Sequence, residues 1–308
     1  MASRRPIEDE QLGDIWFELV ACEAKQPSLR DGVVTVISSR FEQQWRLGWP
    51  ELPSRPAAPA AAESSSRLTR IRAPLGDGAC TTLHVASYRR GAFRPRVVLL
   101  ERPAPLVRWC EQHRVSDAIV GGFFVRAQYE VLGELRIAGE RLPSVPFDSP
   151  WSAVRACAHI DGEALQIVAR DGLGAEPAGD LLQAGPLLVR DGRIAVADGE
   201  DREGFSAAAH QFDSDVTAGR YPRAALGLAG DRMLAVACDG RTDRDAGMTL
   251  SELAHSLVAL GVSDAINLDG GGSASLVHDG RLRNRPREPH GLDLLDGRPV
   301  MTAVVFER

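Results

Sequence analysis

The chain has 308 residues and almost no lysine. Lys25 is its one lysine, so nearly all of the 36 basic residues are arginine, as in a GC-rich, bacterial-like coding sequence. Walker-type phosphate loops, Schiff-base enzymes and protein kinases each depend on a particular lysine. The sequence offers no candidate for that residue, which argues against these three classes.

Cysteine pairs, an excess of positive charge and long apolar runs are missing too. The five cysteines are widely spaced and form no Cys-x-x-Cys pair, which argues against a disulfide framework and a zinc site. The net charge of −6 gives no reason to expect nucleic acid or an anionic membrane as a partner. The first eleven residues are rich in charge and lack the apolar stretch of a signal peptide, and no run reaches the roughly 20 apolar residues of a membrane span. We therefore expect a cytoplasmic protein.

The composition, 44% hydrophobic and 25% charged, is that of a protein with a substantial core. A run of proline, alanine and serine over residues 53–66 is typical of a linker. We therefore divide the chain into a small N-terminal extension (1–50), a linker (51–66) and a strand-rich domain (67–308). For this domain we expect an α+β fold with mixed β-sheets and a few helices.

Several strands can be placed in the domain from their residue pattern. Residues 68–73 and 81–88 alternate and are separated by a Gly-Asp-Gly turn, which predicts a hairpin. Residues 130–137 and 181–190 are each expected to form one strand. Residues 198–217 are polar and acidic, and we expect a surface loop there. Its Asp213-Ser214-Asp215 has the spacing of a divalent-cation motif, but such spacing arises by chance in acidic loops, so no metal site is assigned.

The most distinctive stretch covers residues 264–277, where two apolar runs flank Asp269, three glycines and Ser273. Glycine loses more backbone entropy on folding than other residues, so three in succession indicate positive φ or a close backbone approach. Their N–H groups can form an anion-binding nest, with Asp269 at its mouth and Ser273 as a further donor. A tight turn capped by Asp269 fits the same residues equally well.

A strand–helix–strand unit leads into this stretch. Residues 233–238 predict a strand that ends before Asp239, and residues 264–268 predict one that ends before Asp269. Between them, Thr249 and Glu252 have the spacing of a helix capping box. A βαβ unit would bring both aspartates to one sheet edge, about 5 Å apart for neighbouring strands or about 10 Å with one strand between. Paired carboxylates at such spacing suit glycosidic-bond cleavage. Two Asx turns before glycine are the alternative.

A pair of glycines, Gly121 and Gly122, ends the strand predicted over residues 118–120 and is followed by Phe123 and Phe124. Adjacent glycines at a strand end indicate a close backbone approach. The two phenylalanines could wall a pocket beside them. Core aromatics next to a bulge are an equally good interpretation.

Taken together, a series of motifs resembles the phosphodiester glycosidase family. They follow the family order and cover about residues 67–308: Gly122-Phe123-Phe124, Glu130 with Leu132-Gly133, Gln183-Ala184-Gly185-Pro186, Arg223 before Ala225-Leu226-Gly227, Asp239-Gly240-Arg241, Gly247-Met248-Thr249-Leu250 with Glu252, Asn267 to Ser273 (NLDGGGS), and Arg298-Pro299-Val300.

The resemblance implies hydrolysis of a sugar-1-phosphodiester, such as an N-acetylglucosamine-1-phosphodiester, at the anomeric carbon, without a cofactor. The products are a free sugar and a phosphomonoester. Asp269 and Asp239 are the first candidates for the catalytic carboxylate, with Glu130 as a third. Arg223 is expected to hold the phosphate in a bidentate manner. The remaining candidates for substrate binding are Arg241, Gly122, Phe123, Asn267, Gly270, Gly271, Gly272 and Ser273.

The sequence departs from the family pattern at two positions. Val120 stands where the family usually has asparagine, and Ala224 stands where it usually has threonine. These losses leave two other functions open: a sugar-phosphate or nucleotide-sugar binding protein without turnover, and an interaction protein in polysaccharide assembly that docks through residues 1–50. The sugar, its anomer, the aglycone and the oligomeric state are not specified by the sequence.

Overall fold

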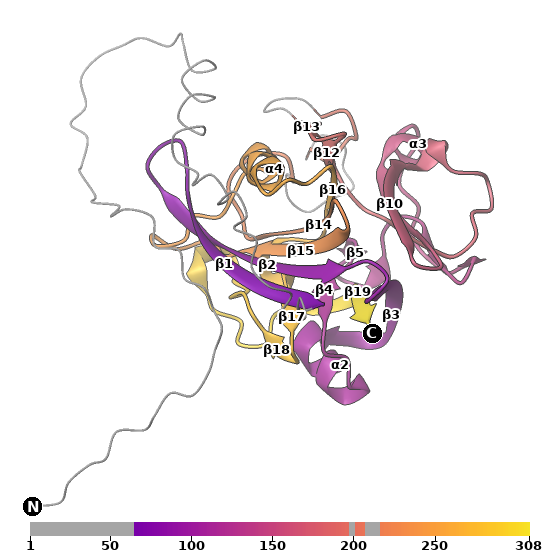
Figure 1. Cartoon of the computed structure of the whole chain (residues 1–308), viewed down its shortest axis with the longest axis horizontal. Coiled ribbons are helices and arrows are strands. Elements are labelled where there is room, and N and C mark those ends of the chain that lie inside the picture. The colour runs from indigo at the N-terminus through magenta and orange to yellow at the C-terminus, as the bar shows by residue number, and fades with distance from the viewer. Residues whose placement is uncertain (1–64, 197–200, 207–215) are drawn as a thin grey trace, which may run out of the picture.

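A computed structural model of the protein describes residues 65–196, 201–206 and 216–308, which fold mainly into β-strands (Figure 1). The predicted extension, nearly all of the linker and the Asp213-Ser214-Asp215 motif lie outside the described residues. The expected α+β class agrees at the coarse level, because three β-sheets of five or more strands are accompanied by a few helices. No helix in the described part of the chain is long and apolar enough to cross a membrane.

The largest sheet has seven strands in the order β1-β2-β15-β14-β16-β12-β13, and all its pairings are antiparallel. The predicted hairpin is confirmed as β1–β2, in which Ser66 pairs with Tyr88 and Pro74 with Cys80. The strands of this sheet are β1 (Ser66–Pro74), β2 (Cys80–Arg89), β12 (Leu187–Arg190), β13 (Arg193–Ile194), β14 (Arg223–Ala229), β15 (Arg232–Cys238) and β16 (Asp264–Asn267).

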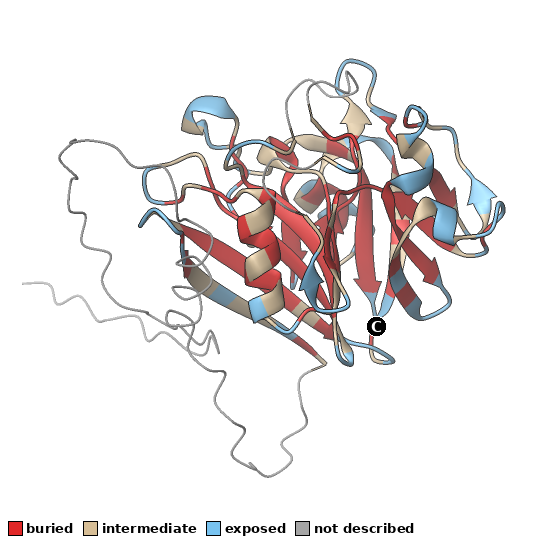
Figure 2. Cartoon of the chain, turned by 90° about the horizontal axis from the view of Figure 1, so that it is seen from above, coloured by how far each residue is buried: buried red, intermediate tan, exposed pale blue. Residues whose placement is uncertain are grey.

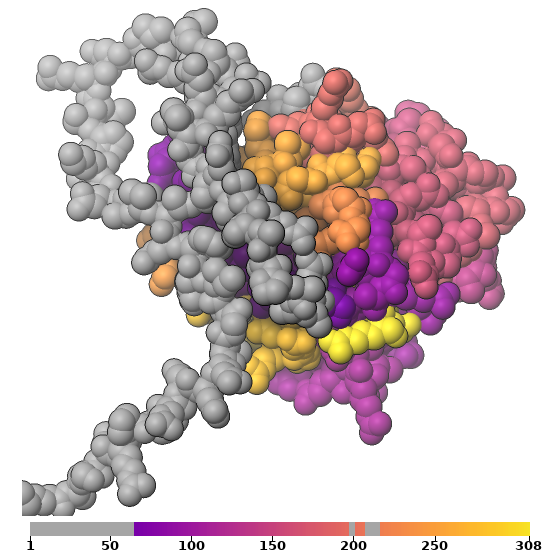
Figure 3. All heavy atoms as spheres, in the orientation of Figure 1, coloured from indigo at the N-terminus to yellow at the C-terminus, as the bar shows by residue number. Residues whose placement is uncertain are grey.

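A second sheet of five strands has the order β18-β17-β4-β19-β3. Its strands are β3 (Arg94–Pro105), β4 (Ala118–Val120), β17 (Leu276–His278), β18 (Arg281–Leu282) and β19 (Pro299–Glu307). The last strand, β19, lies between β3 and β4, so segments about 200 residues apart are joined (Figure 3).

The third sheet has the order β10-β9-β11-β7-β8, and a two-stranded ribbon pairs β5 with β6. Their strands are β5 (Phe124–Val125), β6 (Glu130–Val131), β7 (Leu135–Ile137), β8 (Glu140–Arg141), β9 (Ala156–Asp161), β10 (Ala164–Ala169) and β11 (Asp180–Gln183). The helices are α2 (Leu106–His113), α3 (Trp151–Val154) and α4 (Leu250–Ala259), with short 3₁₀ turns at Arg170–Gly172, Gly271–Ser273 and Pro289–Gly291.

Two of the predicted strands are wrong in the same way, because each is broken at a glycine. Residues 130–137 divide into β6 and β7 around Gly133, whose φ is +95°. Residues 181–190 divide into β11 and β12 around Gly185, whose φ is +128°, and the two halves belong to different sheets. Such φ values are open to glycine and strained for other residues. The apolar pattern continued across both breaks and concealed them.

The strands on either side of α4 are not neighbours. Both β15 and β16 pair antiparallel with β14, which lies between them. They therefore run in the same direction with one strand between, the wider of the two spacings that the sequence allowed. The turns after β15 and β16, which carry Asp239 and Asp269, thus flank the residue before β14, Pro222.

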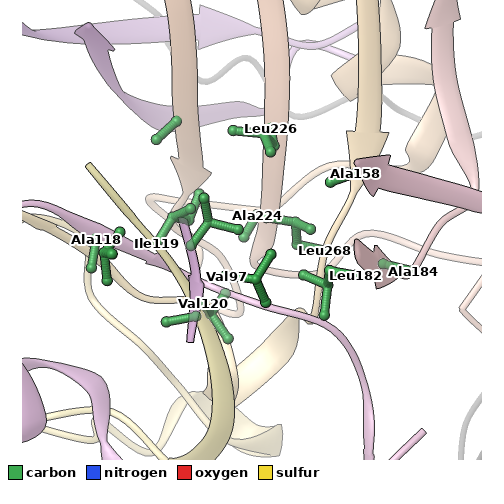
Figure 4. Packing of buried hydrophobic residues seen from close by; sticks show 14 of the residues in the cluster. Val97, Ala118, Ile119, Val120, Ala158, Leu182, Ala184, Ala224, Leu226 and Leu268 are labelled. Carbon is green, nitrogen blue, oxygen red and sulfur yellow. The ribbon is translucent and has the colours of Figure 1, made fainter. Parts of the chain in front are cut away.

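The core fills the space between the sheets, and exposed residues are concentrated in turns and loops (Figure 2). Four of its side chains show how distant segments converge: Val97 of β3, Val120 of β4, Ala224 of β14 and Leu268 after β16 (Figure 4). The part of the predicted 198–217 loop that the structure describes is not simply surface. Phe205 is fully buried in this core, so the expectation of a surface loop is wrong at that residue.

Helix α4 begins with the predicted capping box. The Thr249 hydroxyl accepts from the N–H of Glu252 at 3.1 Å, and the Glu252 carboxylate accepts from the N–H of Thr249 at 2.9 Å. Replacing the N-cap leaves one of the first N–H groups of the helix without its partner. We expect Thr249→Ala to lower the free energy of unfolding by about 1 kcal/mol in urea denaturation. Thr249→Ser keeps the acceptor and should restore most of the loss; equal losses in both variants would contradict the capping role.

Candidate functional site

The backbone around Asp269 is held at both ends by strands of different sheets. The N–H of Asp269 donates to the carbonyl oxygen of Gly121, at the end of β4, at 3.0 Å. The N–H of Gly271 donates to the carbonyl oxygen of Pro222, just before β14, at 2.8 Å. These two bonds fix the position of the intervening residues, and Gly271 turns the chain with a φ of +61°.

The carboxylate of Asp269 accepts from the N–H of Gly270 at 2.9 Å and from the hydroxyl of Ser273. It remains partly exposed. The surrounding protein nevertheless disfavours its charged form, so that burial raises its pKa to about 6. The Ser273 hydroxyl and the positive charges of Arg298 and Arg126 act in the opposite direction and limit the rise. The group can therefore exchange a proton near neutral pH.

An arginine–glutamate cluster surrounds the glycine turn. Arg298 forms a short ion pair with Glu288, with N–O distances of 2.6 Å, and its Nη1 lies 3.4 Å from the Ser273 hydroxyl oxygen. Nη1 of Arg241 lies 4.0 Å from a carboxylate oxygen of Glu288. A Cβ at Gly271 would lie 3.2 Å from Nη2 of Arg241, and one at Gly272 only 2.9 Å from Glu288. The close approach that the glycines predicted is therefore made by these charged side chains.

The family model for the phosphodiester glycosidases matches residues 113–307, well over half of the chain. The chain belongs to the phosphodiester glycosidase family.

Solved structures share the fold of this glycosidase-family chain at low identity. The zebrafish N-acetylglucosamine-1-phosphodiester α-N-acetylglucosaminidase catalytic domain, auto-inhibited by its pro-peptide, matches with a TM-score of 0.61 and 18% identity over 82% of this chain and 87% of that one. A hypothetical protein from Synechocystis matches with a TM-score of 0.54 and 18% identity over 82% of this chain, which spans 64% of that protein. No curated protein matches the chain.

Asp239 is the second expected catalytic carboxylate, and its hydrogen bonds are made to other residues of the fold. It is buried, and one carboxylate oxygen lies 3.1 Å from Nε2 of His84 while the other accepts from the N–H of Arg285 at 2.6 Å. Burial alone would raise the pKa of Asp239, but the hydrogen bond and charge of His84 and the N–H of Arg285 lower it below the usual value. Asp239 is thus held as a carboxylate by its partners, and among the described residues no hydrogen bond joins it to Asp269.

Arg223, the residue expected to grip phosphate, is also occupied. Its buried guanidinium donates to the carbonyl oxygens of Met248 at 3.0 Å, Val216 at 3.0 Å and Gly219 at 3.2 Å. These bonds tie the chain before β14 to the start of α4. Each nitrogen of the guanidinium thus donates to a backbone carbonyl oxygen. This geometry does not favour the expected bidentate phosphate contact, which stays a prediction.

The predicted anion nest is largely closed. The N–H of Gly270 donates to Asp269 and that of Gly271 to Pro222, so two of the three glycine N–H groups already have partners within the protein. The interpretation as a tight turn capped by Asp269 is therefore the better one for Gly270 and Gly271. Gly272 supplies its carbonyl oxygen to the N–H of Arg298 at 3.0 Å.

Among the other predicted residues, Gly122, Phe123 and Asn267 have their contacts elsewhere in the protein. Gly122 donates its N–H to Thr302 at 3.0 Å, and Phe123 packs in the core against Phe205. Asn267 is buried, and its amide donates to the carbonyl oxygen of Gly185 at 2.9 Å. Ser273 and Arg241 lie beside the Asp269 turn, and their role in substrate binding stays a prediction.

Glu130 is exposed at one end of the β5–β6 ribbon. Arg126 follows β5, and its positive charge lowers the pKa of Asp269. Arg126, Glu288 and Arg298 were missed as site residues. Arg298 could have been found, because it lies in the Arg298-Pro299-Val300 motif. Nothing in the sequence around Arg126 or Glu288 distinguishes them from other surface charges.

The opposite pKa shifts of two aspartates give a test that uses folding stability. Ionised Asp269 is disfavoured in the folded protein, so its contribution to stability falls as pH rises from about 4 to about 6. We expect Asp269→Asn to raise the free energy of unfolding at pH 8 by about 1 to 3 kcal/mol and to change it little at pH 4. Asp239→Asn removes a favourable charge and should lower the free energy of unfolding at pH 8 by about 2 kcal/mol.

Urea denaturation of both variants at the two pH values checks these signs. Asparagine keeps the shape of the aspartate side chain at both positions. Both aspartates follow a strand and precede a glycine, so each variant is a control for the other. Destabilisation by Asp269→Asn at pH 8 would mean that its charge is favourable in the fold.

Proposed function

We propose that the protein is a hydrolase that cleaves the glycosidic C–O bond of an N-acetylglucosamine-1-phosphodiester-like substrate. The products are the free sugar and a phosphomonoester. The observation that carries this proposal is Asp269, a partly exposed carboxyl of raised pKa within an arginine cluster. It lies in the segment that the family model matches.

In the proposed reaction, the bond between the anomeric carbon and the phosphate oxygen breaks, and its electron pair leaves with the phosphate. Water adds to the anomeric carbon and loses a proton. Asp269, ionised above a pKa of about 6, is suited to accept that proton or to stabilise the positive charge that develops on the sugar. Phosphate leaves readily, so a strong general acid is not required.

Arg298 and Arg241 are the proposed partners of the phosphate, in place of Arg223. A phosphodiester carries one negative charge, and the leaving group gains more as the bond breaks. Both guanidinium groups lie against the glycine turn, and Arg126 adds positive charge. Glu288 holds Arg298 in position through paired hydrogen bonds. A bound phosphate would compete with Glu288 for the same donors, and guanidinium binds either anion through paired hydrogen bonds.

Turnover should depend on the carboxylate of Asp269. With α-linked N-acetylglucosamine phosphodiesters, including UDP-N-acetylglucosamine, we expect free sugar as the product and a fall in kcat of at least about 100-fold in Asp269→Asn. In ¹⁸O-labelled water, cleavage at the anomeric carbon places the label in the sugar. The kcat/KM of the unchanged protein should decline below about pH 6, because Asp269 becomes protonated.

Asp231→Asn, an exposed aspartate in the β14–β15 turn, is the control and should leave turnover unchanged. Label in the phosphate would mean P–O cleavage and would overturn the proposed chemistry. Full activity in Asp269→Asn would remove Asp269 from the mechanism.

The role of Arg298 can be separated from that of a structural ion pair. Arg298→Gln removes the charge that lowers the pKa of Asp269, so the acid limb of the kcat/KM profile should move to higher pH. The KM should rise by about 10- to 100-fold through loss of a charged hydrogen bond. Arg281→Gln, at an exposed position of β18, should change neither quantity. A fall in kcat alone, with the pH profile unmoved, would contradict the assignment.

A second candidate, a sugar-phosphate or nucleotide-sugar binding protein without turnover, rests on Val120. Its side chain is fully buried among apolar residues (Figure 4), so no amide is offered where the family usually has asparagine. Tight binding of sugar phosphates in a thermal-shift screen, without product, would favour this candidate. A cytoplasmic location and a small-molecule substrate without nucleic acid or membrane partners remain predictions.

A further inference from the structure

A second cluster of ionisable side chains lies at the other end of β4 from Gly121. Asp117 directly precedes β4, His278 is the last residue of β17, and Asp279 begins the turn to β18 (Figure 1). Nε2 of His278 lies 3.8 Å from a carboxylate oxygen of Asp117, and its Nδ1 lies 3.3 Å from one of Asp279. One possible ligand atom from each residue falls within 4.8 Å of the other two.

The imidazole of His278 has an unusual environment. The residue is only 5% exposed, yet neither ring nitrogen has a hydrogen-bond partner among the described residues. Its nearest polar neighbours are two carboxylates, which when ionised can only accept. A neutral imidazole has one donor and one acceptor nitrogen, so the acceptor faces negative oxygen with nothing positive between. A buried polar group in this state is costly unless a further partner is supplied.

We propose that Asp117, His278 and Asp279 form a binding site for a divalent cation of the zinc class. Zinc accepts imidazole nitrogen and carboxylate oxygen at about 2.0 to 2.2 Å, which places two ligands of a tetrahedral site about 3.4 Å apart. One imidazole gives an ion only one of its nitrogens. One of the two separations, 3.8 Å from Nε2 to Asp117 or 3.3 Å from Nδ1 to Asp279, therefore joins two ligand atoms, and either lies near that value. The third ligand atom falls within 4.8 Å of the other two, so its carboxylate would move towards the ion on binding. Two carboxylates and a neutral imidazole balance the charge of the ion.

The residues around the cluster orient its ligands. The hydroxyl of Tyr88 donates to Asp117 at 3.1 Å, and the backbone N–H of Asp279 also donates to that carboxylate. Tyr88 is fully buried and stacked on Phe306, with ring centroids 4.0 Å apart, so its hydroxyl is fixed. Outer hydrogen bonds of this kind are a regular feature of metal sites. Arg283 is a competing cation, with Nη2 3.8 Å from Asp279.

The position of this site assigns it a structural role. Gly121 lies four positions after Asp117, about 13 Å along an extended chain, and its carbonyl oxygen accepts from the N–H of Asp269. The bound ion would join the start of β4 to the β17–β18 turn. Asp269 lies at the opposite end of β4, where its N–H donates to Gly121. The side chain of Asp279 is 64% exposed and gives an ion access from solvent.

The test measures Zn²⁺ binding to the full chain after treatment with a chelator. We expect one equivalent of Zn²⁺ by calorimetry and elemental analysis, and a higher Tm with the ion than without. His278→Gln and Asp279→Asn should each weaken binding at least about tenfold and remove most of the Tm increase. Co²⁺ in the same site should give d–d bands without a thiolate charge-transfer band, which separates it from cysteine.

Asp191→Asn is the matched control for Asp279→Asn. Both aspartates precede glycine in an exposed two-strand turn, and both have a φ of +49°. Asp191→Asn should leave Zn²⁺ affinity unchanged. Absence of stoichiometric Zn²⁺ binding, or binding that survives both His278→Gln and Asp279→Asn, would overturn the proposal.

Discussion

The hydrogen bond from the N–H of Asp269 to the carbonyl oxygen of Gly121 joins the ends of strands from two different sheets. The position of the candidate site depends on it. With the bond from Gly271 to Pro222, it places the carboxylate where β4 and β16 end and β14 begins. Position 121 has room only for glycine against β19, because a Cβ there would lie 2.4 Å from the hydroxyl oxygen of Thr302. The site is therefore a consequence of how the two sheets meet.

Two aspartates with the same local sequence show how tertiary contacts decide chemistry. Asp239 and Asp269 each follow a strand and precede glycine, and both are desolvated. Asp239 lies beside His84 of β2 and remains a low-pKa anchor. Asp269 has a hydroxyl, one N–H and more distant arginines, which only partly offset the cost of burial. The partner of each carboxylate, and not its sequence context, determines which of them can exchange protons near neutral pH.

Local features were predictable from the sequence, and side-chain partners were not. The β1–β2 hairpin and the capping box of α4 involve residues close in sequence, and both are confirmed. The breaks at Gly133 and Gly185 were hidden because apolar residues continue through them. The occupation of Arg223 by three carbonyl oxygens depends on how the chain folds back from Val216 to Met248. Glu288 and Arg126 become visible as site residues only when the loops are folded over Asp269.

The position of β19 affects how the protein can be assembled during synthesis. Because β19 pairs with both β3 and β4, the second sheet lacks an interior strand until residues 299–307 have left the ribosome. Gly121 is held against β19 by its bond to Thr302, so the contact between Gly121 and Asp269 is also incomplete until then. Contacts between strands far apart in sequence close large loops and form slowly. A nascent chain therefore exposes the unpaired edges of β3 and β4 for most of its elongation, and such edges are prone to pair with other chains.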